Sequence, residues 1–224
     1  MLKIIVVGAA GKMGQRICAL IEKNPKLAKP LKATRNFPLA QCIETGDMII
    51  DFSSIEATLQ AIPLAVKYHK PIVIGTTGLS GPEMDLIRNA AKVIPVVYSS
   101  NMSLGVNVLW KLLETAAHAL KKYWHVAISE THHVHKKDSP SGTAKTMADI
   151  CEKILGMRPT IDATREGEVV GDHSAVFDSA LETLQIRHHA KSRDVFAAGA
   201  ITAALWLVGK KPGLYTMGNV LGLI

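Results

Sequence analysis

The stretch of residues 130–144, Glu-Thr-His-His-Val-His-Lys-Lys-Asp-Ser-Pro-Ser-Gly-Thr-Ala, concentrates side chains that can do chemistry. Three histidines and two lysines fall between His132 and Lys137. Histidine is the side chain most easily made into a proton donor near neutral pH. Lysine, together with the N–H groups of a helix start, suits a carboxylated substrate. The stretch therefore predicts an acid beside an anion site, with a solvated basic loop as the alternative that it leaves open.

The totals of the chain exclude several classes of protein. With 224 residues, of which 48% are hydrophobic, the chain can bury a core and is not a disordered protein. No apolar run reaches the roughly 18 residues that span a bilayer, and the first apolar segment is too short for a signal peptide. Three widely separated cysteines predict free thiols. We therefore expect a cytoplasmic protein without a membrane partner.

The net charge of +7 allows nucleic acid, a membrane surface or small anions as partners. The basic residues are spread along the chain, and only 5% of the residues are aromatic, so a surface that stacks bases is not expected. The charge thus favours small anionic ligands and no nucleic acid.

The N-terminal segment has the pattern of a dinucleotide site. Residues 2–7 predict a buried strand, the glycines of Gly8-Ala-Ala-Gly-Lys-Met-Gly14 follow, and an amphipathic helix comes next. This order lets a pyrophosphate lie on a helix N-terminus. Gly8 is expected to make the tight turn, Gly11 to admit the phosphates, and Gly14 to let the helix pack on the strand. The spacing is G-x-x-G-x-x-G and differs from the commoner G-x-G-x-x-G.

The next expected strand, residues 31–35, lacks the acidic residue that usually binds the ribose 2′-hydroxyl. Arg35 stands at its end, and a planar guanidinium suits a 2′-phosphate. This favours NADPH over NADH. One alternative is that Arg35 is an ordinary surface residue. The other is that Lys32 binds the 2′-phosphate in its place.

Strands and helices then alternate regularly. Residues 48–52, 71–75 and 94–98 predict buried strands, and residues 54–68 and 80–92 predict helices, the first of them kinked at Pro63. The alternation predicts a Rossmann-like, doubly wound parallel sheet, an α/β fold. Ligands of such sheets lie beyond the carboxyl ends of the strands. That geometry is expected to gather a set of polar and small residues along one crevice: Gly11, Ser53, Thr76, Thr77 and Ser99–Met102. The alternative is that each of them is simply a turn residue.

A second, α+β region is expected after a long helix that begins at Ser103. Tyr123–Glu130 alternates as a half-exposed strand, and residues 174–177 and 183–189 predict further strands of an open mixed sheet. One broad apolar face of this sheet is expected to be covered by an oligomer partner. Phe196–Val208 predicts an apolar helix that returns to the first domain. The predicted domains are residues 1–103 with 194–224, which bind the dinucleotide, and residues 104–193, which bind substrate and build the oligomer.

Five motifs occur in order: residues 8–14, Asp51-Phe-Ser53, Gly75-Thr-Thr-Gly78, Ser100-Asn-Met-Ser-Leu-Gly-Val-Asn-Val108, and the histidine-rich residues 130–144. With Lys191-Ser-Arg193 and Ala204-Leu-Trp-Leu207, this ordered set resembles the 4-hydroxy-tetrahydrodipicolinate reductase (dihydrodipicolinate reductase) family over nearly the whole chain. Two departures are a short segment between Arg35 and Asp51, and Met102 where many relatives carry an aromatic.

The resemblance implies a homotetramer that transfers hydride from NADPH or NADH to a cyclic, unsaturated dicarboxylate. It implies that His132 is the general acid and that Lys136 binds and polarises the substrate. His133 and the backbone of Gly142 and Thr143 would hold the carboxylates. The implied cofactor site comprises Gly8, Ala9, Ala10, Gly11, Lys12, Met13, Gly75, Thr76, Thr77, Ser99, Ser100, Asn101 and Met102, beside Arg35.

Other readings stay open at this point. A reductase acting on a different carboxylated imine shares the same parts, and a dinucleotide sensor without catalysis shares the first domain. His132, His133 and His135 could suggest zinc. Adjacent residues of a strand point to opposite faces, however, and no cysteine or paired carboxylate completes a tetrahedral set, so we expect no metal.

Overall fold

The computed structural model describes residues 1–121 and 124–223. The chain divides into two compact units, Met1–Ser103 with Asp194–Ile224, and Leu104–Arg193. These are the boundaries that the sequence predicts, while the binding roles of the two units stay predictions. None of the helices described is long and apolar enough to cross a membrane.

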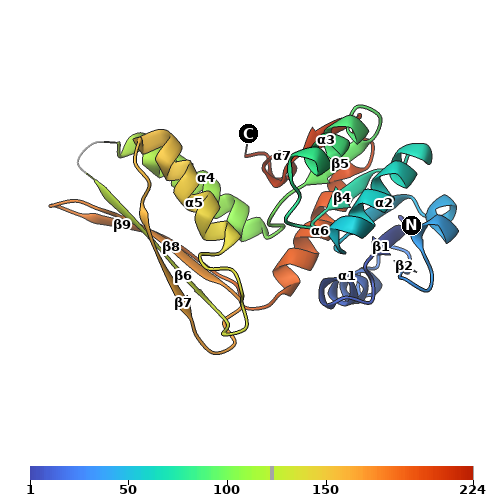
Figure 1. Ribbon diagram of the computed structural model, residues 1–224, viewed down its shortest axis with the longest axis horizontal. Coiled ribbons are helices and arrows are strands. Elements are labelled where there is room, and N and C mark those ends of the chain that lie inside the picture. Colours follow the sequence, from blue (N-terminus) through green and yellow to red (C-terminus); the bar gives the residue numbers. More distant parts are fainter. Residues whose placement is uncertain (122–123, 224) are drawn as a thin grey trace. The chain divides into compact units, whose positions relative to one another are not determined.

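The first unit is built on a six-stranded parallel sheet (Figure 1). Its strand order is β10-β5-β4-β3-β1-β2, with every neighbouring pair parallel. The strands are β1 (Ile4–Val7), β2 (Leu31–Ala33), β3 (Met48–Asp51), β4 (Ile72–Ile74), β5 (Pro95–Tyr98) and β10 (Gly213–Tyr215). The sequence prediction of a Rossmann-like sheet is confirmed.

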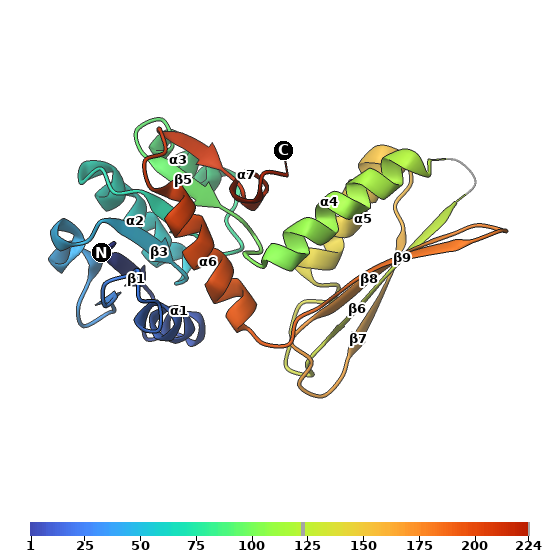
Figure 2. The ribbon, with the colours of Figure 1, turned by 180° about the vertical axis from the view of Figure 1, so that it is seen from behind.

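Helices cover both faces of this sheet (Figures 1 and 2). On one side α1 (Lys12–Glu22) contacts α6 (Asp194–Leu207), which also contacts β3, β4 and β5; on the other, α2 (Ile55–Lys67) contacts α3 (Gly81–Ala90). Ser54 caps α2 by accepting a hydrogen bond from the Ala57 N–H, and α2 continues through Pro63 as one element. Because both faces are covered, the strands are apolar without alternation.

The short elements of this unit are not predicted from the sequence. Two 3₁₀ turns, η1 (Leu39–Gln41) and η2 (Ile43–Thr45), fill the segment between β2 and β3, and α7 (Met217–Leu221) follows β10. Each has five residues or fewer, too few to show a period.

The second unit has a four-stranded mixed sheet of order β7-β6-β8-β9. The strands β6 (His125–His132), β8 (Asp172–Asp178) and β9 (Thr183–His189) are antiparallel neighbours, and β7 (Thr160–Arg165) pairs parallel with β6. The mixed sheet is confirmed, but β7 is not predicted, because Thr-Ile-Asp-Ala-Thr-Arg has only weak apolar alternation. Tyr123, the expected start of β6, lies outside the described residues.

The apolar face of this sheet lies inside the unit. Helices α4 (Leu104–Ala119) and α5 (Gly142–Leu155) pack on it, and their core joins Leu113 and Met147 to Ile128, Ala175 and Phe177. The strand registers put mainly polar residues on the other face, among them Ser129, Asp162, Asp172, Gln185 and Arg187. The expectation of a broad apolar face left for an oligomer partner is therefore wrong, since the chain's own helices cover it.

Candidate active site

Strand β6 ends at His132, two residues beyond the expected end at Glu130. The alternation of the strand therefore puts Glu130 and His132 on the same side, facing the helices. Both residues are buried, with 2% and 7% of their surfaces exposed. A carboxylate and an imidazole in such a place must be hydrogen-bonded to be tolerated.

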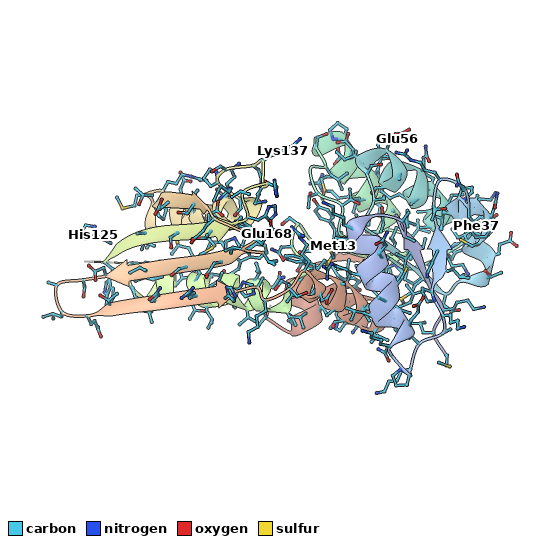
Figure 3. The ribbon with its side chains drawn as sticks, turned by 90° about the horizontal axis from the view of Figure 1, so that it is seen from below. Met13, Phe37, Glu56, His125, Lys137 and Glu168 are labelled. Atoms are coloured by element: carbon cyan, nitrogen blue, oxygen red, sulfur yellow. The ribbon has the colours of Figure 1, made fainter. Side chains whose placement is uncertain are left out.

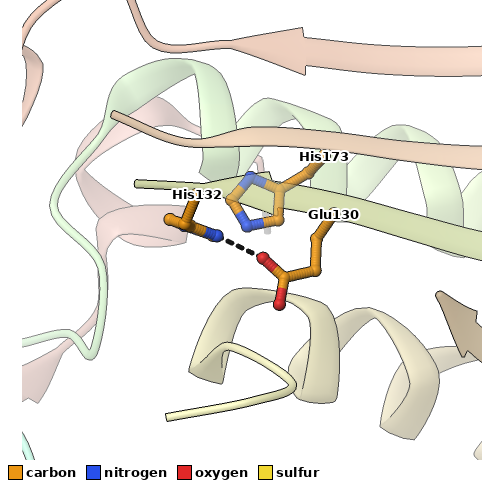
Figure 4. A group of neighbouring side chains, drawn as sticks. All are labelled: Glu130, His132 and His173. Carbon is orange, nitrogen blue, oxygen red and sulfur yellow. Dashed lines mark hydrogen bonds and ion pairs between the residues drawn. The ribbon is translucent and has the colours of Figure 1, made fainter. Parts of the chain in front are cut away.

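The Glu130 carboxylate has donors on both oxygens. Its Oε2 bonds to Nδ1 of His132 (Figure 4), and its Oε1 accepts the Ser141 N–H at 3.0 Å. Nη2 of Arg165 lies 3.0 Å from the same Oε1. The bonds from Ser141, Arg165 and His132 outweigh burial, which acts in the opposite direction, and hold the pKa of Glu130 below its usual value.

Arg165 reaches the site because β7 pairs with β6 in a register that sets it beside His132. The guanidinium also donates to the carbonyls of Asp138 at 2.6 Å and Thr164 at 2.7 Å. It thereby ties the loop after β6 to the end of β7. No sequence signal marks Arg165, because its position depends on the pairing of β7 with β6, which cannot be predicted from the sequence pattern.

His173 is the second residue that sequence reasoning does not single out. It comes from β8, opposite Glu130, and its ring stands edge-on to that of His132 with centroids 5.0 Å apart (Figure 4). Its Nε2 lies 3.2 Å from the hydroxyl oxygen of Ser141. Burial, with a further contribution from His132, lowers the pKa of His173 to about 4, so this ring is neutral near pH 7.

The pKa of His132 is set by opposing effects. Burial lowers it, the bond and charge of Glu130 raise it, and the positive charges of Lys136 and Arg165 lower it again. The net direction is below the usual value. The cationic neighbours Lys136 and Arg165 thus act in the same direction as burial, which is the larger cause.

The residues expected to hold the substrate follow β6. Lys136 forms an ion pair with Asp138, with Nζ and Oδ1 2.7 Å apart, and this pairing lowers the pKa of Asp138 against the opposing effect of burial. His133 is partly buried and has a lowered pKa, through desolvation and the charge of Arg193. Gly142 is exposed at the first position of α5, with Thr143 next to it. Ser141 caps that helix by accepting from the Ala144 N–H at 3.2 Å.

Two other conspicuous residues lie on the outside. The side chain of His135 is 77% exposed, with Glu168 3.9 Å away, and Lys137 is also exposed. In Figure 3, Lys137 and Glu168 lie at one end of the four-stranded sheet and His125 lies at the other. The basic residues of the loop thus divide into a group near Glu130 and a solvated group.

A metal fits this cluster poorly. Glu130, His132 and His173 place one potential ligand atom each within 4.8 Å of one another. However, both carboxylate oxygens already accept bonds, and the Arg165 guanidinium brings a positive charge to the same group. A divalent cation would have to displace these donors, so the arrangement suits the handling of a proton better.

In the first unit, the loops after the parallel strands meet at one edge of the sheet. Backbone bonds join neighbouring strand ends: Ala9 N–H to Ala33 O at 3.2 Å, Phe52 N–H to Val7 O at 3.3 Å, and Gly75 N–H to Asp51 O at 2.9 Å. The residues predicted to bind a cofactor, Gly8–Met13, Arg35, Gly75–Thr77 and Ser99–Met102, follow these strands. The edge is where parallel sheets bind dinucleotides.

The glycine loop has the tight geometry that its sequence predicts. Gly8 adopts a φ of +77°, and a Cβ there would lie 2.6 Å from the Phe52 carbonyl oxygen. A Cβ on Gly14 would lie 2.1 Å from the Gly8 carbonyl oxygen, so α1 packs directly on the loop. Gly11 is the N-cap of α1 and has no side chain to accept the first helix amides. Such amides suit an anion.

Several expected cofactor residues have side chains that are already engaged in the interior. Thr76 Oγ1 bonds to Thr58 Oγ1 at 3.0 Å, Ser99 Oγ donates to the Asn101 carbonyl at 2.7 Å, and Met102 is 2% exposed. Only their backbones remain suitable for a ligand. Thr77, Ser100 and Arg35 are exposed, whereas Lys32, the alternative to Arg35, pairs with Glu22 at 3.0 Å.

Asp51 lies beneath this edge at the end of β3 and is fully buried. Ser53 donates a hydrogen bond to Oδ1 at 2.5 Å, and burial raises the pKa of Asp51 against that bond. The Ser53 N–H in turn donates to Thr76 Oγ1 at 3.3 Å. These bonds tie the loops after β3 and β4 together.

Comparison with known proteins identifies the family. The family model described as dihydrodipicolinate reductase, N-terminus, matches residues 2–102, and that described as dihydrodipicolinate reductase, C-terminus, matches residues 105–221. A relative from Syntrophus aciditrophicus (strain SB), named 4-hydroxy-tetrahydrodipicolinate reductase, is 40% identical, with 99% of each chain covered. A relative of the same name from Akkermansia muciniphila is 41% identical, covering 100% of this chain and 99% of its own.

A solved structure shows the same fold. The dipicolinate-bound dihydrodipicolinate reductase from Paenisporosarcina sp. TG-14 superposes with a TM-score of 0.85 at 19% identity, covering 98% of this chain and 99% of its own. Both halves of the sequence thus match the family models, and the fold matches that of the solved reductase. The chain belongs to the dihydrodipicolinate reductase family.

Proposed function

We propose that this protein reduces 4-hydroxy-tetrahydrodipicolinate to tetrahydrodipicolinate in diaminopimelate and lysine biosynthesis, with NADPH or NADH. The observation that carries the proposal is the end of β6, where a buried histidine bonded to a carboxylate is followed by Lys136 and the start of α5. The family membership of the chain supports it. A dicarboxylate that gains a hydride and a proton requires a proton donor and a site that binds its carboxylates, and this stretch supplies both.

The residues of the second unit that the sequence predicts to act on the substrate each have a role in this proposal. When bound, the reduced nicotinamide supplies the hydride. His132 then protonates the substrate carbon, and Lys136 binds and polarises the substrate once a substrate carboxylate replaces Asp138 as its partner. His133 and the backbone N–H groups of Gly142 and Thr143 hold the carboxylates, aided by the positive end of the α5 dipole.

The first unit supplies the cofactor site. The backbone of Gly8–Met13 receives the pyrophosphate at the uncapped start of α1. Gly75–Thr77 and Ser99–Met102 line the rest of the groove, mainly through their backbones. Arg35, exposed after β2, contacts the 2′-phosphate of NADPH.

The proposal extends to the assembly and location of the protein. We expect a homotetramer in the cytoplasm. The uncovered, mainly polar face of the four-stranded sheet offers a surface for a second copy, and three free, buried cysteines suit a reducing compartment.

The direct test of the function follows the nicotinamide absorbance with freshly made product of dihydrodipicolinate synthase. Oxidation of NADPH or NADH that depends on this substrate is the expected result. Oxidation only with another cyclic carboxylated imine would indicate a different reductase. Binding of the cofactor without oxidation under any of these conditions would indicate a sensor, and either outcome would overturn the proposal.

Substitution of Arg35 tests the cofactor preference. Arg35→Ala should weaken NADPH binding about 10-fold and leave NADH binding unchanged. This is the low end of the range for a lost hydrogen bond to a charged group, because Arg35 is exposed to solvent. Fluorescence titration of both cofactors measures this. Lys32→Ala is the matched control, since Lys32 pairs with Glu22. Unchanged affinity for both cofactors in Arg35→Ala would remove Arg35 from the site.

Substrate binding should take up a proton. The lowered pKa leaves His132 mostly neutral at pH 7 in the free protein, and a bound dicarboxylate raises that pKa by adding negative charge. Pyridine-2,6-dicarboxylate should therefore bind more tightly as the pH falls from about 7 to about 6. Calorimetry at pH 7 in buffers of different ionisation enthalpy measures the uptake, and His132→Gln should abolish it. Binding without proton uptake in the wild type would contradict this charge balance.

A further inference from the structure

We propose that Glu130 is a positioning residue for the reaction, which holds the His132 ring in one tautomer and fixes it relative to the start of α5. The inference rests on the proposed function, in which His132 donates the proton and α5 holds a carboxylate. It assigns a role to Glu130, which the proposed function cites as the partner of His132 without giving it a role.

The tautomer follows from the chemistry of the pair. A carboxylate only accepts hydrogen bonds, so Nδ1 of His132, which bonds to Glu130, must carry a hydrogen. The proton that the reaction consumes therefore comes from Nε2. Gly171 lies next to this atom: a Cβ at residue 171 would approach Nε2 to 3.1 Å, so a larger side chain there would crowd it.

The other carboxylate oxygen links the acid to the anion site. Glu130 Oε1 accepts the backbone N–H of Ser141, the N-cap of α5, at 3.0 Å. Ser141 is itself buried and bonds through its hydroxyl to the Ala144 N–H and towards His173. One carboxylate thus fixes both the imidazole and the first turn of the helix, and Arg165 holds that carboxylate from β7.

Glu130 also governs the charge of the acid. The ionisable groups around His132 are Glu130 on its own strand, Arg165 on β7, His173 on β8, and Lys136 and Asp138 in the following loop. Lys136 and Arg165 disfavour the imidazolium, and His173 is neutral near pH 7. Asp138 is engaged by Lys136. Glu130 is therefore the main group that favours protonation of His132.

A purely structural role for Glu130 makes a different prediction. A brace that only ties β6 to β7 and α5 would change stability when it is removed. It would not change the titration of His132 in a protein that stays folded. The experiment must therefore read the ring itself as well as the rate.

The variant Glu130→Gln in the full-length protein makes this distinction. Nitrogen NMR of the histidine rings, with the His132 signal assigned by its loss in His132→Gln, reports the tautomer and the pKa. We expect the pKa of His132 to fall and the preference for hydrogen on Nδ1 to weaken. In turnover, kcat should fall about 10- to 100-fold, part of what a general acid contributes, with the cofactor KM unchanged.

The pH profile gives a second reading. The acid must be protonated, so kcat falls as the pH rises through the pKa of His132, and a lower pKa moves this descending limb to lower pH. Glu182→Gln, in the exposed turn between β8 and β9, is the matched control and should leave rate, profile and titration as in the wild type.

A double variant guards against misfolding. Removal of Glu130 alone leaves Arg165 charged in a partly buried position, whereas Glu130→Gln with Arg165→Met removes both charges together. In Glu130→Gln, an unchanged tautomer and pKa of His132, or an unmoved descending limb, would overturn the proposal. In the double variant the two lost charges act on the pKa of His132 in opposite directions, so there an unchanged tautomer is the result that would overturn it. Absence of turnover in the wild type would instead remove the proposed function, while the ring titration would still decide whether Glu130 controls His132.

Discussion

His132→Gln should lower kcat by about 10²- to 10⁴-fold, the usual contribution of a positioned general acid. Glutamine cannot supply a proton at neutral pH, so protonation of the substrate carbon would depend on water or on Lys136. Its side-chain amide can still donate to Glu130, which keeps the buried carboxylate bonded and the fold intact. The cofactor affinity should stay near the wild-type value, because the residues proposed to bind it belong to the other unit.

His125→Gln is the matched control for this experiment. His125 starts the same strand but lies at the opposite end of the sheet from the Lys137 loop (Figure 3), exposed to solvent. It should change neither kcat nor stability. Turnover of His132→Gln within a few-fold of the wild type, measured with saturating cofactor and fresh substrate, would show that another group donates the proton.

Much of the first unit could be predicted because its strands are continuous apolar runs bounded by turn residues. Ile72–Ile74, buried on both faces, and the glycine loop after β1 are signals that need only local sequence. β7 and β10 could not be predicted in this way. Thr160–Arg165 becomes a strand because α5 returns the chain parallel to β6, so tertiary pairing decides its structure.

The residues of the candidate site divide in the same way, into those that local sequence predicts and those whose position depends on tertiary pairing. His132, His133, Lys136 and the α5 start come from one stretch, which is why their types and spacing point to an acid beside an anion site. Two of the groups around His132 come from elsewhere in the chain: Arg165 from β7 and His173 from β8. Burial of Glu130 could not be foreseen either, since it depends on β6 continuing to His132 and keeping both residues on the helix side.

Gly14→Ala should damage the cofactor site more than any other single methyl group at the glycine loop. A Cβ at residue 14 would lie 2.1 Å from the Gly8 carbonyl oxygen and 2.7 Å from the Ala9 Cα, and these are backbone atoms that cannot rotate away. Helix α1 must therefore move off the loop. We expect a loss of about 1–3 kcal/mol in the stability of the first unit, the usual range for overpacking. Because the pyrophosphate is proposed to bind at the start of α1, cofactor affinity should fall at least about 10-fold.

Gly81→Ala separates this effect from the general consequences of replacing glycine. Gly81 begins α3, and an added Cβ there would meet no atom within 4 Å. The substitution reduces the backbone freedom of the unfolded chain, so its effect on the stability of the protein should be neutral or slightly stabilising, by up to about 1 kcal/mol. Thermal unfolding and fluorescence titration with NADPH, run on both variants, compare a tight glycine with an open one. Wild-type affinity in a destabilised Gly14→Ala would mean that the loop packs as described but does not hold the pyrophosphate, and the cofactor site would then have to be sought among the loops after β4 and β5.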